Sequence, residues 1–309
     1  MALEIGLCMT VKDEADNIVA CLDPIIDLFA KVVIIDTGSS DETPTILRER
    51  FGLRPAMMPL SEERCFALAD ARNWGFDQLD TTWLVTLDAD ERIDRRALTG
   101  LASLNDNELP GGIFCAWDTR VDHDTVIPDY KLWMFRNQHR HWGHVHDTAQ
   151  PSLRFGGDTA CWYPDLRLDH LPDPRRAEYK RIFYERRLDC AMRLDPDWLR
   201  YAWFKGHNAY KRGDIAIALA SLQPLHDKRP PLFPVESLYA SMLLASIHAQ
   251  EGNARLCEEV LADALGFHAR VAGDFEVVVN GPVISWLHQA RDLAAQRDLA
   301  DLTPLAFPY

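Results

Sequence analysis

Three short apolar segments, each followed directly by a polar turn rich in carboxylates, constrain the fold of this chain more than any other feature. The segments are residues 5–11, 31–36 and 83–87, and they have the length and the composition of buried parallel strands. Apolar residues at helical spacing follow each of the first two segments. Strand and helix therefore alternate, which predicts a doubly wound α/β sheet with right-handed crossovers.

The polar turns after these strands carry the candidate chemistry. They are residues 10–14 (TVKDE), 36–41 (DTGSSD) and 88–91 (DADE). Ligands of open α/β sheets bind at the carboxyl ends of the strands, so we expect the three turns to surround one site. The carboxylates of Asp88 and Asp90 are the oxygen ligands that hard divalent cations prefer. A single acidic turn is common as a helix cap, so the functional signal is the combination of all three in this order.

The charge balance restricts what kind of partner the chain can bind. It has 47 acidic and 33 basic residues among 309, a formal net charge of −14. Such a chain repels phosphate backbones on average, which disfavours general nucleic-acid binding. If the substrate is itself an anion, a cation must neutralise part of this charge.

Cysteine usage and hydropathy indicate a cytoplasmic protein. The seven cysteines are scattered and form no CxxC pair, so we expect reduced thiols instead of a disulfide framework or a zinc cluster. The first residues lack the basic and apolar regions of a signal peptide. No apolar run reaches the ~18 residues of a membrane span, so we expect at most peripheral membrane contact.

The motifs resemble those of the family 2 glycosyltransferases, which have the GT-A fold, over roughly residues 3–172. The bacterial branch of that family has T-x-K-N-E, D-[TS]-G-S-x-D, A-R-N and D-A-D-E in this order. The third motif is present as residues 71–73 (ARN), on a helix that we expect over 65–77. The clear departure is Asp13, which stands where the family usually has Asn.

The resemblance implies a metal-dependent, inverting transfer of a sugar from a nucleotide-diphosphate donor, with a UDP-sugar expected. A divalent cation, Mn²⁺ or Mg²⁺, would be held by Asp88 and Asp90 and would stabilise charge on the leaving diphosphate. Asp36 would contact the nucleoside, and Arg72 would position Asp88 or the diphosphate. The full set implied for donor binding is Thr10, Lys12, Glu14, Asp36, Asp41, Arg72, Asp88 and Arg136.

The acceptor side is expected between residues 113 and 170. We expect strands near 112–117 and 130–137, followed by residues 142–147 (WGHVHD), which match a family pattern of G-x-[VI]-H-[ED]. The resemblance implies a carboxylate here as general base, and we assign Asp147, with Glu91 as the alternative. Family members also have a late histidine that ligates the metal. His170 stands at that place, and His146 is the alternative.

Residues 173–309 form a second, all-α domain in this interpretation, after a hinge at Pro172. We expect helices over 175–194, 197–212, 214–227, 235–251, 254–266 and 281–299, and a short extended piece near 274–281. Gly213 and Gly252 separate helix pairs, and small residues around them resemble tetratricopeptide (TPR) repeats. Such hairpins form a surface for an acceptor, a protein partner or a second subunit of a homodimer.

Two other functions compete with this interpretation. A nucleotidyltransferase is disfavoured because that class usually has a Gly-rich basic loop after its first strand, where this chain has residues 12–14 (KDE). A non-catalytic TPR-like scaffold is the other alternative, against which the intact Asp88 and Asp90 argue. Among glycosyltransferases, cell-envelope glycan or glycoconjugate synthesis is expected, with a glycan or lipid-linked acceptor. Transfer to a peptide or protein is the alternative.

Overall fold

The computed structural model describes residues 3–122, 124–299 and 302–308. The chain divides into two compact units, Met1–Arg187 with Pro308, and Leu188–Phe307. The division falls within helix α6 (Ala177–Leu194), later than the expected boundary after Pro172. The first turns of α6 belong to the first unit, where Lys180 donates to Asp90.

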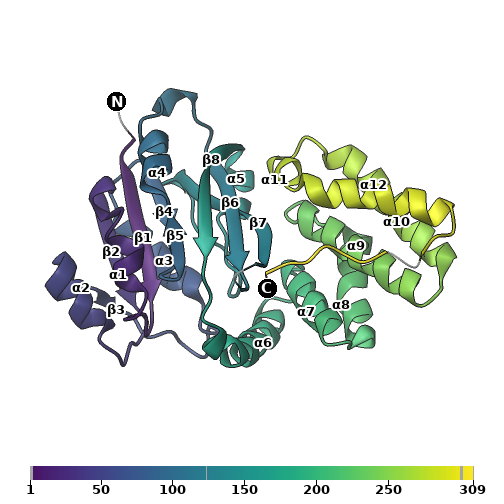
Figure 1. Cartoon of the computed structure of the whole chain (residues 1–309), viewed down its shortest axis with the longest axis horizontal. Helices are drawn as coiled ribbons and strands as arrows, with labels where there is room; N and C mark the ends of the chain where they lie inside the picture. Colours follow the sequence, from purple (N-terminus) through teal and green to yellow (C-terminus); the bar gives the residue numbers. More distant parts are fainter. Residues whose placement is uncertain (1–2, 123, 300–301, 309) are drawn as a thin grey trace. The chain divides into compact units, whose positions relative to one another are not determined.

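The first unit is built on an eight-stranded mixed sheet, as far as its described residues show (Figure 1). The strand order is β3-β2-β1-β4-β7-β6-β8-β5. The strands are β1 (Ile5–Val11), β2 (Lys31–Asp36), β3 (Ala56–Met57), β4 (Trp83–Thr86), β5 (Glu91–Ile93), β6 (Gly112–Arg120), β7 (Val126–Arg136) and β8 (Ala160–His170). Strands β3, β2, β1 and β4 are parallel, whereas β7 is antiparallel to β4.

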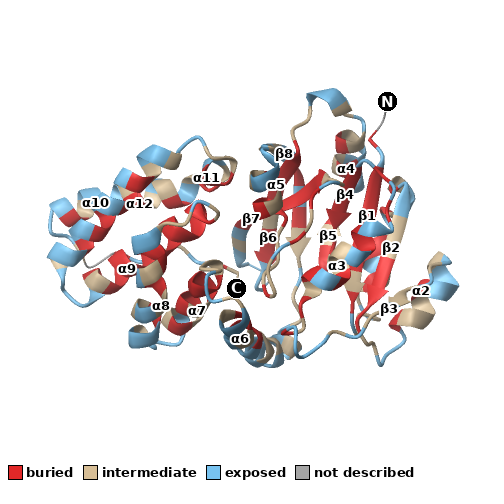
Figure 2. Cartoon of the chain, turned by 180° about the vertical axis from the view of Figure 1, so that it is seen from behind, coloured by how far each residue is buried: buried red, intermediate tan, exposed pale blue. Residues whose placement is uncertain are grey.

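The two central strands explain why the first turns meet. β1 and β4 are buried along almost their whole length, as a strand covered on both faces requires (Figure 2). Val11 is paired with Asp36, and Cys8 with Thr86, so the carboxyl ends of β1, β2 and β4 lie at one edge. All three acidic turns follow these ends, which confirms the expected doubly wound α/β arrangement.

Helix α3 (Leu68–Asp77) packs directly on this part of the sheet. A Cβ on its Gly75 would lie 2.5 Å from Cys8 Sγ and 2.7 Å from Ile35 Cδ1, so only glycine permits this close approach to β1 and β2. The helix begins later than expected because Cys65 and Phe66 have positive φ. The other helices of this unit are α1 (Ile18–Leu22), α2 (Thr43–Phe51), α4 (Arg95–Ala102) and α5 (Gln150–Gly156).

The second unit is all-helical in its described residues, as predicted. Its helices are α7 (Arg200–Lys211), α8 (Ile215–Lys228), α9 (Pro234–Gln250), α10 (Ala254–Val271), α11 (Phe275–Val279) and α12 (Gly281–Ala295). Helix α7 packs on α8 and α9 packs on α10, and the glycines between the helices of each pair, Gly213 and Gly252, have positive φ. The expected extended piece near 274–281 is wrong, because Asp274 caps a short helix, α11, there.

Gly206 lies where α7 packs closely on α8. A Cβ at this position would lie 2.5 Å from Leu222 Cγ. We expect Gly206→Ala to lower the free energy of unfolding of the helical unit by ~1–3 kcal/mol, because the added methyl forces Leu222 out of its place. Urea unfolding measures this effect. Gly266→Ala in α10 is the matched control, since a Cβ there meets nothing within 4 Å and alanine stabilises a helix interior. Equal stabilities of the two variants would contradict the packing argument.

Two further observations concern the thiols and the membrane. Cys65 and Cys190 each take part in a disulfide, so the expectation that all cysteines are reduced is wrong for these two. Cys8, Cys21, Cys115, Cys161 and Cys257 are free. Within the described ranges, the helices all lack the combination of length and apolar character needed to cross a bilayer.

Candidate active site

One end of the candidate site is the turn after β2. Asp36 is fully buried, and its Oδ1 accepts hydrogen bonds from the backbone N–H groups of Gly38 and Ser39 at 2.8 and 2.7 Å. Its other oxygen, Oδ2, is buried without a hydrogen-bond partner among the described residues. An unpaired buried acceptor is costly unless a ligand completes it, so Asp36 is ready to accept from an N–H or O–H group of a bound molecule.

The turns after β1 and β2 are tied to each other. Asp13 has a φ of 55°, a conformation that Asn and Asp tolerate better than most residues. Its Oδ1 accepts from the N–H of Ser40 at 2.7 Å, and its own N–H donates to Ser39 Oγ. Asp13 can therefore stand where the family has Asn, because the contact requires only a short side chain with an acceptor. Asp41 accepts a hydrogen bond from the N–H of Ala15, so it also connects the turn after β2 to the turn after β1.

Arg72 joins two of the predicted site carboxylates. Its Nη1 donates to Asp147 Oδ1 at 2.8 Å, and its Nη2 donates to Asp88 Oδ1 at 3.1 Å. The Asp147 side chain is only 4% exposed, whereas Asp88 is open to solvent. Burial alone would raise the pKa of Asp147, but Arg72 and the hydrogen bond from His141 hold this pKa well below its usual range. Asp147 is therefore ionised at neutral pH.

Asn73, the last residue of the A-R-N motif, holds His141, which is the second partner of Asp147. The Asn73 side chain donates to the carbonyl of His141 and accepts from its N–H, both at 2.8 Å. His141 Nδ1 lies 2.6 Å from Asp147 Oδ2. Burial lowers the pKa of His141 despite this carboxylate, which favours the neutral ring. Helix α3 thus orients Asp147 both directly, through Arg72, and indirectly, through Asn73.

Asp90 and His170 come together from distant parts of the sequence. β5 and β8 are antiparallel neighbours with Glu91 paired to His170, which brings His170 Nε2 to 3.5 Å from Asp90 Oδ2. The other ring nitrogen, Nδ1, lies 2.9 Å from Thr119 Oγ1, and the ring stacks on Trp117 at 4.8 Å between centroids. These contacts hold the imidazole with Nε2 facing Asp90, as a metal-ligating histidine requires.

The donor chemistry of this pair fits a divalent cation. One carboxylate and one imidazole face each other, and Asp88 is two residues away, a combination that suits Mn²⁺ as well as Mg²⁺. In the described ranges, no three His, Cys, Asp or Glu side chains are already gathered in a ligand set. An ammonium group, Nζ of Lys180, lies 3.3 Å from Asp90 Oδ2. Burial raises the pKa of Asp90, but His170 and Lys180 outweigh it, so its pKa lies below the usual range.

Glu91, the alternative base, has no exposed surface. Its Oε1 accepts from Lys131 Nζ and from Trp117 Nε1, both at 2.6 Å, and its Oε2 accepts from the N–H of Asp88. Burial raises the pKa of Glu91 in spite of the Lys131 ammonium. These bonds fix the loop that carries Asp88 and Asp90. They also engage both oxygens of Glu91 within the protein, and neither oxygen is exposed.

Four other predicted residues have different surroundings. Arg136 pairs with Trp83, at the amino end of β4, and bonds to Asp106. It is therefore at the opposite edge of the sheet from Asp88, and we leave it out of the donor site. The ring of His146 stacks on Tyr184. Thr10 is half-buried near the end of β1, one residue before Val11, and Lys12 is exposed in the turn that follows.

Two basic residues of this region had no signal in the sequence. Arg176 and Lys180 come after the expected domain boundary, yet Arg176 bonds to Glu14 and Lys180 to Asp90. Their spacing of four residues places them on one face of a helix. That spacing is common on solvated helix faces, so the pattern alone could not have assigned them to the site.

Comparison with known proteins assigns most of the first unit to one family. The family model described as "Glycosyl transferase family 2" matches residues 7–160. A TPR repeat-containing protein of Synechococcus elongatus is 33% identical over 100 residues, which cover 32% of this chain and 24% of that protein. The chain thus spans about a quarter of the length of this curated relative.

The solved structures that are similar to this chain have low sequence identity to it. Residues 1–349 of S. aureus TarS, crystallised in complex with UDP-GlcNAc, are 12% identical, with a TM-score of 0.46 over 96% of this chain and 92% of that one. Glucosyl-3-phosphoglycerate synthase from Mycobacterium tuberculosis, in complex with Mn²⁺ and UDP-glucose, is 17% identical. Its TM-score is 0.29, over 38% of this chain and 44% of that chain.

Proposed function

Because residues 7–160 belong to glycosyl transferase family 2, we propose that this chain is a metal-dependent, inverting glycosyltransferase that uses a nucleotide-diphosphate sugar. The observation that carries the proposal is the position of Asp90 and His170 beside the Asp88–Arg72–Asp147 chain. An Asp–His pair that could hold a cation, a guanidinium and a carboxylate of lowered pKa thus lie close to one another, which supports the proposal. A UDP-sugar is the donor that we propose.

The donor would bind along the edge of the sheet from β2 to β4. The free Oδ2 of Asp36 would accept the N–H of the nucleobase, and the Gly38 turn lies beside it. Asp88, Asp90 and His170 would hold the divalent cation, which as a Lewis acid stabilises negative charge on the leaving diphosphate. The Arg72 guanidinium, between two carboxylates, would orient Asp88 toward that end of the donor.

Asp147 is the group that we propose as general base. It is already ionised, and Arg72 and His141 fix its orientation. A bound diphosphate that attracts the Arg72 guanidinium would weaken the pairing of Arg72 with Asp147 and make this carboxylate more basic. Asp147 would then take the proton of the acceptor hydroxyl as that oxygen attacks the anomeric carbon, which inverts the configuration.

The helical unit is proposed to serve the acceptor. Its antiparallel helix pairs, α7 with α8 and α9 with α10, are the kind of unit whose stacking forms a binding surface. A glycan, lipid-linked or peptide acceptor fits this role, and a second subunit is the alternative occupant. We propose that the transferred sugar is used in cell-envelope glycan or glycoconjugate synthesis.

Thermal unfolding with added nucleotides tests the donor site before any acceptor is known. We expect UDP with Mn²⁺ to raise the Tm, because a ligand that binds only the folded state stabilises it by mass action. UDP with EDTA should raise the Tm less. Asp36→Asn should reduce the shift because its amide can present an N–H where an acceptor is needed. No shift with UDP, GDP or ADP under any metal condition would contradict the proposal and favour a scaffold.

A further inference from the structure

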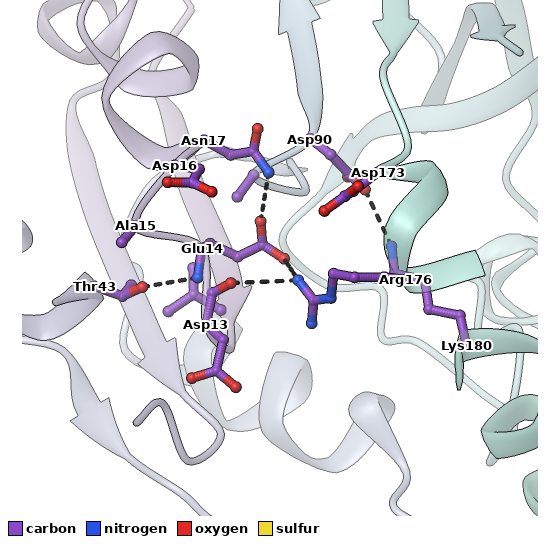
Figure 3. A network of polar contacts seen from close by, with 12 residues as sticks. Asp13, Glu14, Ala15, Asp16, Asn17, Thr43, Asp90, Asp173, Arg176 and Lys180 are labelled. Carbon is purple, nitrogen blue, oxygen red and sulfur yellow. Dashed lines mark hydrogen bonds and ion pairs between the residues drawn. The ribbon is translucent and has the colours of Figure 1, made fainter. Parts of the chain in front are cut away.

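Two basic side chains around the start of α6 bond to neighbouring loops, and one of them, Lys180, reaches the candidate metal site. Arg176 ends the short 3-10 helix η3 (Pro174–Arg176), and Lys180 lies one turn later in α6. Arg176 Nη1 is 3.1 Å from Glu14 Oε1 and donates to the carbonyl of Asp13 at 3.3 Å. Figure 3 shows Arg176 facing the turn after β1, with Lys180 beside it.

Lys180 and His170 converge on the same oxygen. Nζ of Lys180 lies 3.3 Å from Asp90 Oδ2, and Nε2 of His170 lies 3.5 Å from that atom. The Asp90 side chain is 11% exposed, so an uncompensated charge on it would be costly. The ammonium supplies the compensation in this state of the protein, at the oxygen that would bind a divalent cation.

We propose that Lys180 is an exchangeable counter-ion of the metal site, which leaves Asp90 when a divalent cation binds and then pairs with the donor diphosphate. This inference rests on the proposed function. It assigns to the start of α6 a role in donor binding, argued from the contact of Lys180 with Asp90 and from the exposure of the Lys180 side chain.

Electrostatic repulsion gives the reason for the exchange. A cation bound to Asp90 Oδ2 would lie within a few ångströms of the ammonium, and two like charges at such a distance repel by several kcal/mol at an effective dielectric of about 20. Lys180 can leave because its side chain is 35% exposed and its stem is flexible. The diphosphate that arrives with the metal offers new oxygens to the displaced ammonium.

Arg176 keeps the start of the helix in place during this exchange. Its bonds go to Glu14 and to a backbone carbonyl, and Glu14 itself accepts from Asn17 at 2.8 Å. None of these partners is a proposed metal ligand. The backbone can therefore stay fixed while the Lys180 side chain changes partner.

Binding of Mn²⁺, followed by the EPR signal of the free ion, tests the proposal without any turnover. We expect Lys180→Met to bind Mn²⁺ alone about fivefold more tightly than the wild type, because the competing pair is worth ~1 kcal/mol. With Mn²⁺ saturating, the same variant should bind UDP about fivefold more weakly, because the diphosphate loses a cationic partner. Lys180→Gln is a second variant, which keeps a polar end.

Arg181→Met is the matched control. Arg181 is the next residue of α6 and loses the same charge, but it pairs with Glu178 and Glu185 of its own helix. Its Mn²⁺ and UDP affinities should equal those of the wild type. If both Lys180 variants match Arg181→Met in Mn²⁺ affinity, the exchange is refuted while the metal site stands. If no protein binds Mn²⁺ even with UDP, the proposed metal site fails, and this inference fails with it.

Discussion

Replacing Asp90 with asparagine is expected to lower turnover of the sugar donor by about 10³-fold, measured as nucleotide released per enzyme with saturating Mn²⁺. Loss of the Lewis-acid cation removes several kcal/mol of stabilisation from the leaving diphosphate, and each ~1.4 kcal/mol corresponds to a factor of ten. Asparagine keeps the shape of Asp90 and a carbonyl that can accept from Lys180, so the fold should survive. The variant should also lose the Mn²⁺-dependent part of UDP binding.

A matched substitution next to His170 separates this effect from a general loss of charge. Asp169 precedes His170 on β8, but its carboxylate pairs with Arg120 at 2.7 Å. Asp169→Asn removes the same charge close to the same histidine, and we expect it to retain wild-type turnover. Retained turnover in Asp90→Asn would contradict the metal assignment, as would an equal loss in both variants.

Replacing Asp147 with asparagine is expected to lower kcat by about 10²–10⁴-fold, the usual contribution of a general base. Its affinity for UDP with Mn²⁺ should stay close to that of the wild type, because Asp147 is assigned to the acceptor proton and not to the donor. Asp158→Asn is the control. Asp158 is also paired with a histidine, His139, at 2.7 Å, but it lies outside the chain of site carboxylates. An unchanged kcat in Asp147→Asn would overturn the assignment.

The pH dependence of stability provides an independent check on the environment of Asp147. Its pKa in the folded protein is below the ordinary value of 3.8, since Arg72 and His141 outweigh the effect of burial. A lowered pKa in the folded state means that the carboxylate stabilises the protein above about pH 4 and that this contribution is lost as the pH falls. The difference in free energy of unfolding between wild type and Asp147→Asn should therefore shrink from pH 6 to pH 3. A constant difference would contradict the buried pairing.

The core of the sheet could be predicted from the sequence because its strands are continuous apolar runs. β1 and β2 have the expected bounds, and β4 differs by one residue. Strands β3, β5 and β8 were missed. β3 has two residues, β5 has three, and β8 alternates between exposed and half-buried positions at its start, so none of them forms an apolar run. The valines of residues 275–279 suggested extended structure, but a capping aspartate and tertiary packing produce a helix.

Site residues could be predicted from the sequence only where the order of the strands determines their position. Turns that follow neighbouring parallel strands meet at one edge, so the proximity of Asp36 and the Asp88 loop could be expected from their order. Arg136 was misjudged because the direction of β7 is not visible in its composition. Once β7 runs antiparallel to β4, its last residue lies at the wrong edge. Lys180 and Arg176 meet their carboxylates only through tertiary structure.

Release of nucleotide from a panel of UDP-, GDP- and ADP-sugars tests the central claim most directly. The wild-type protein is incubated with each donor in Mn²⁺, in EDTA, and in EDTA followed by excess Mn²⁺. We predict that at least one donor, expected to be a UDP-sugar, is hydrolysed or transferred in Mn²⁺, that EDTA abolishes this turnover, and that added Mn²⁺ restores it. Turnover that is equal in Mn²⁺ and EDTA, or absent with every donor, would contradict a metal-dependent glycosyltransferase.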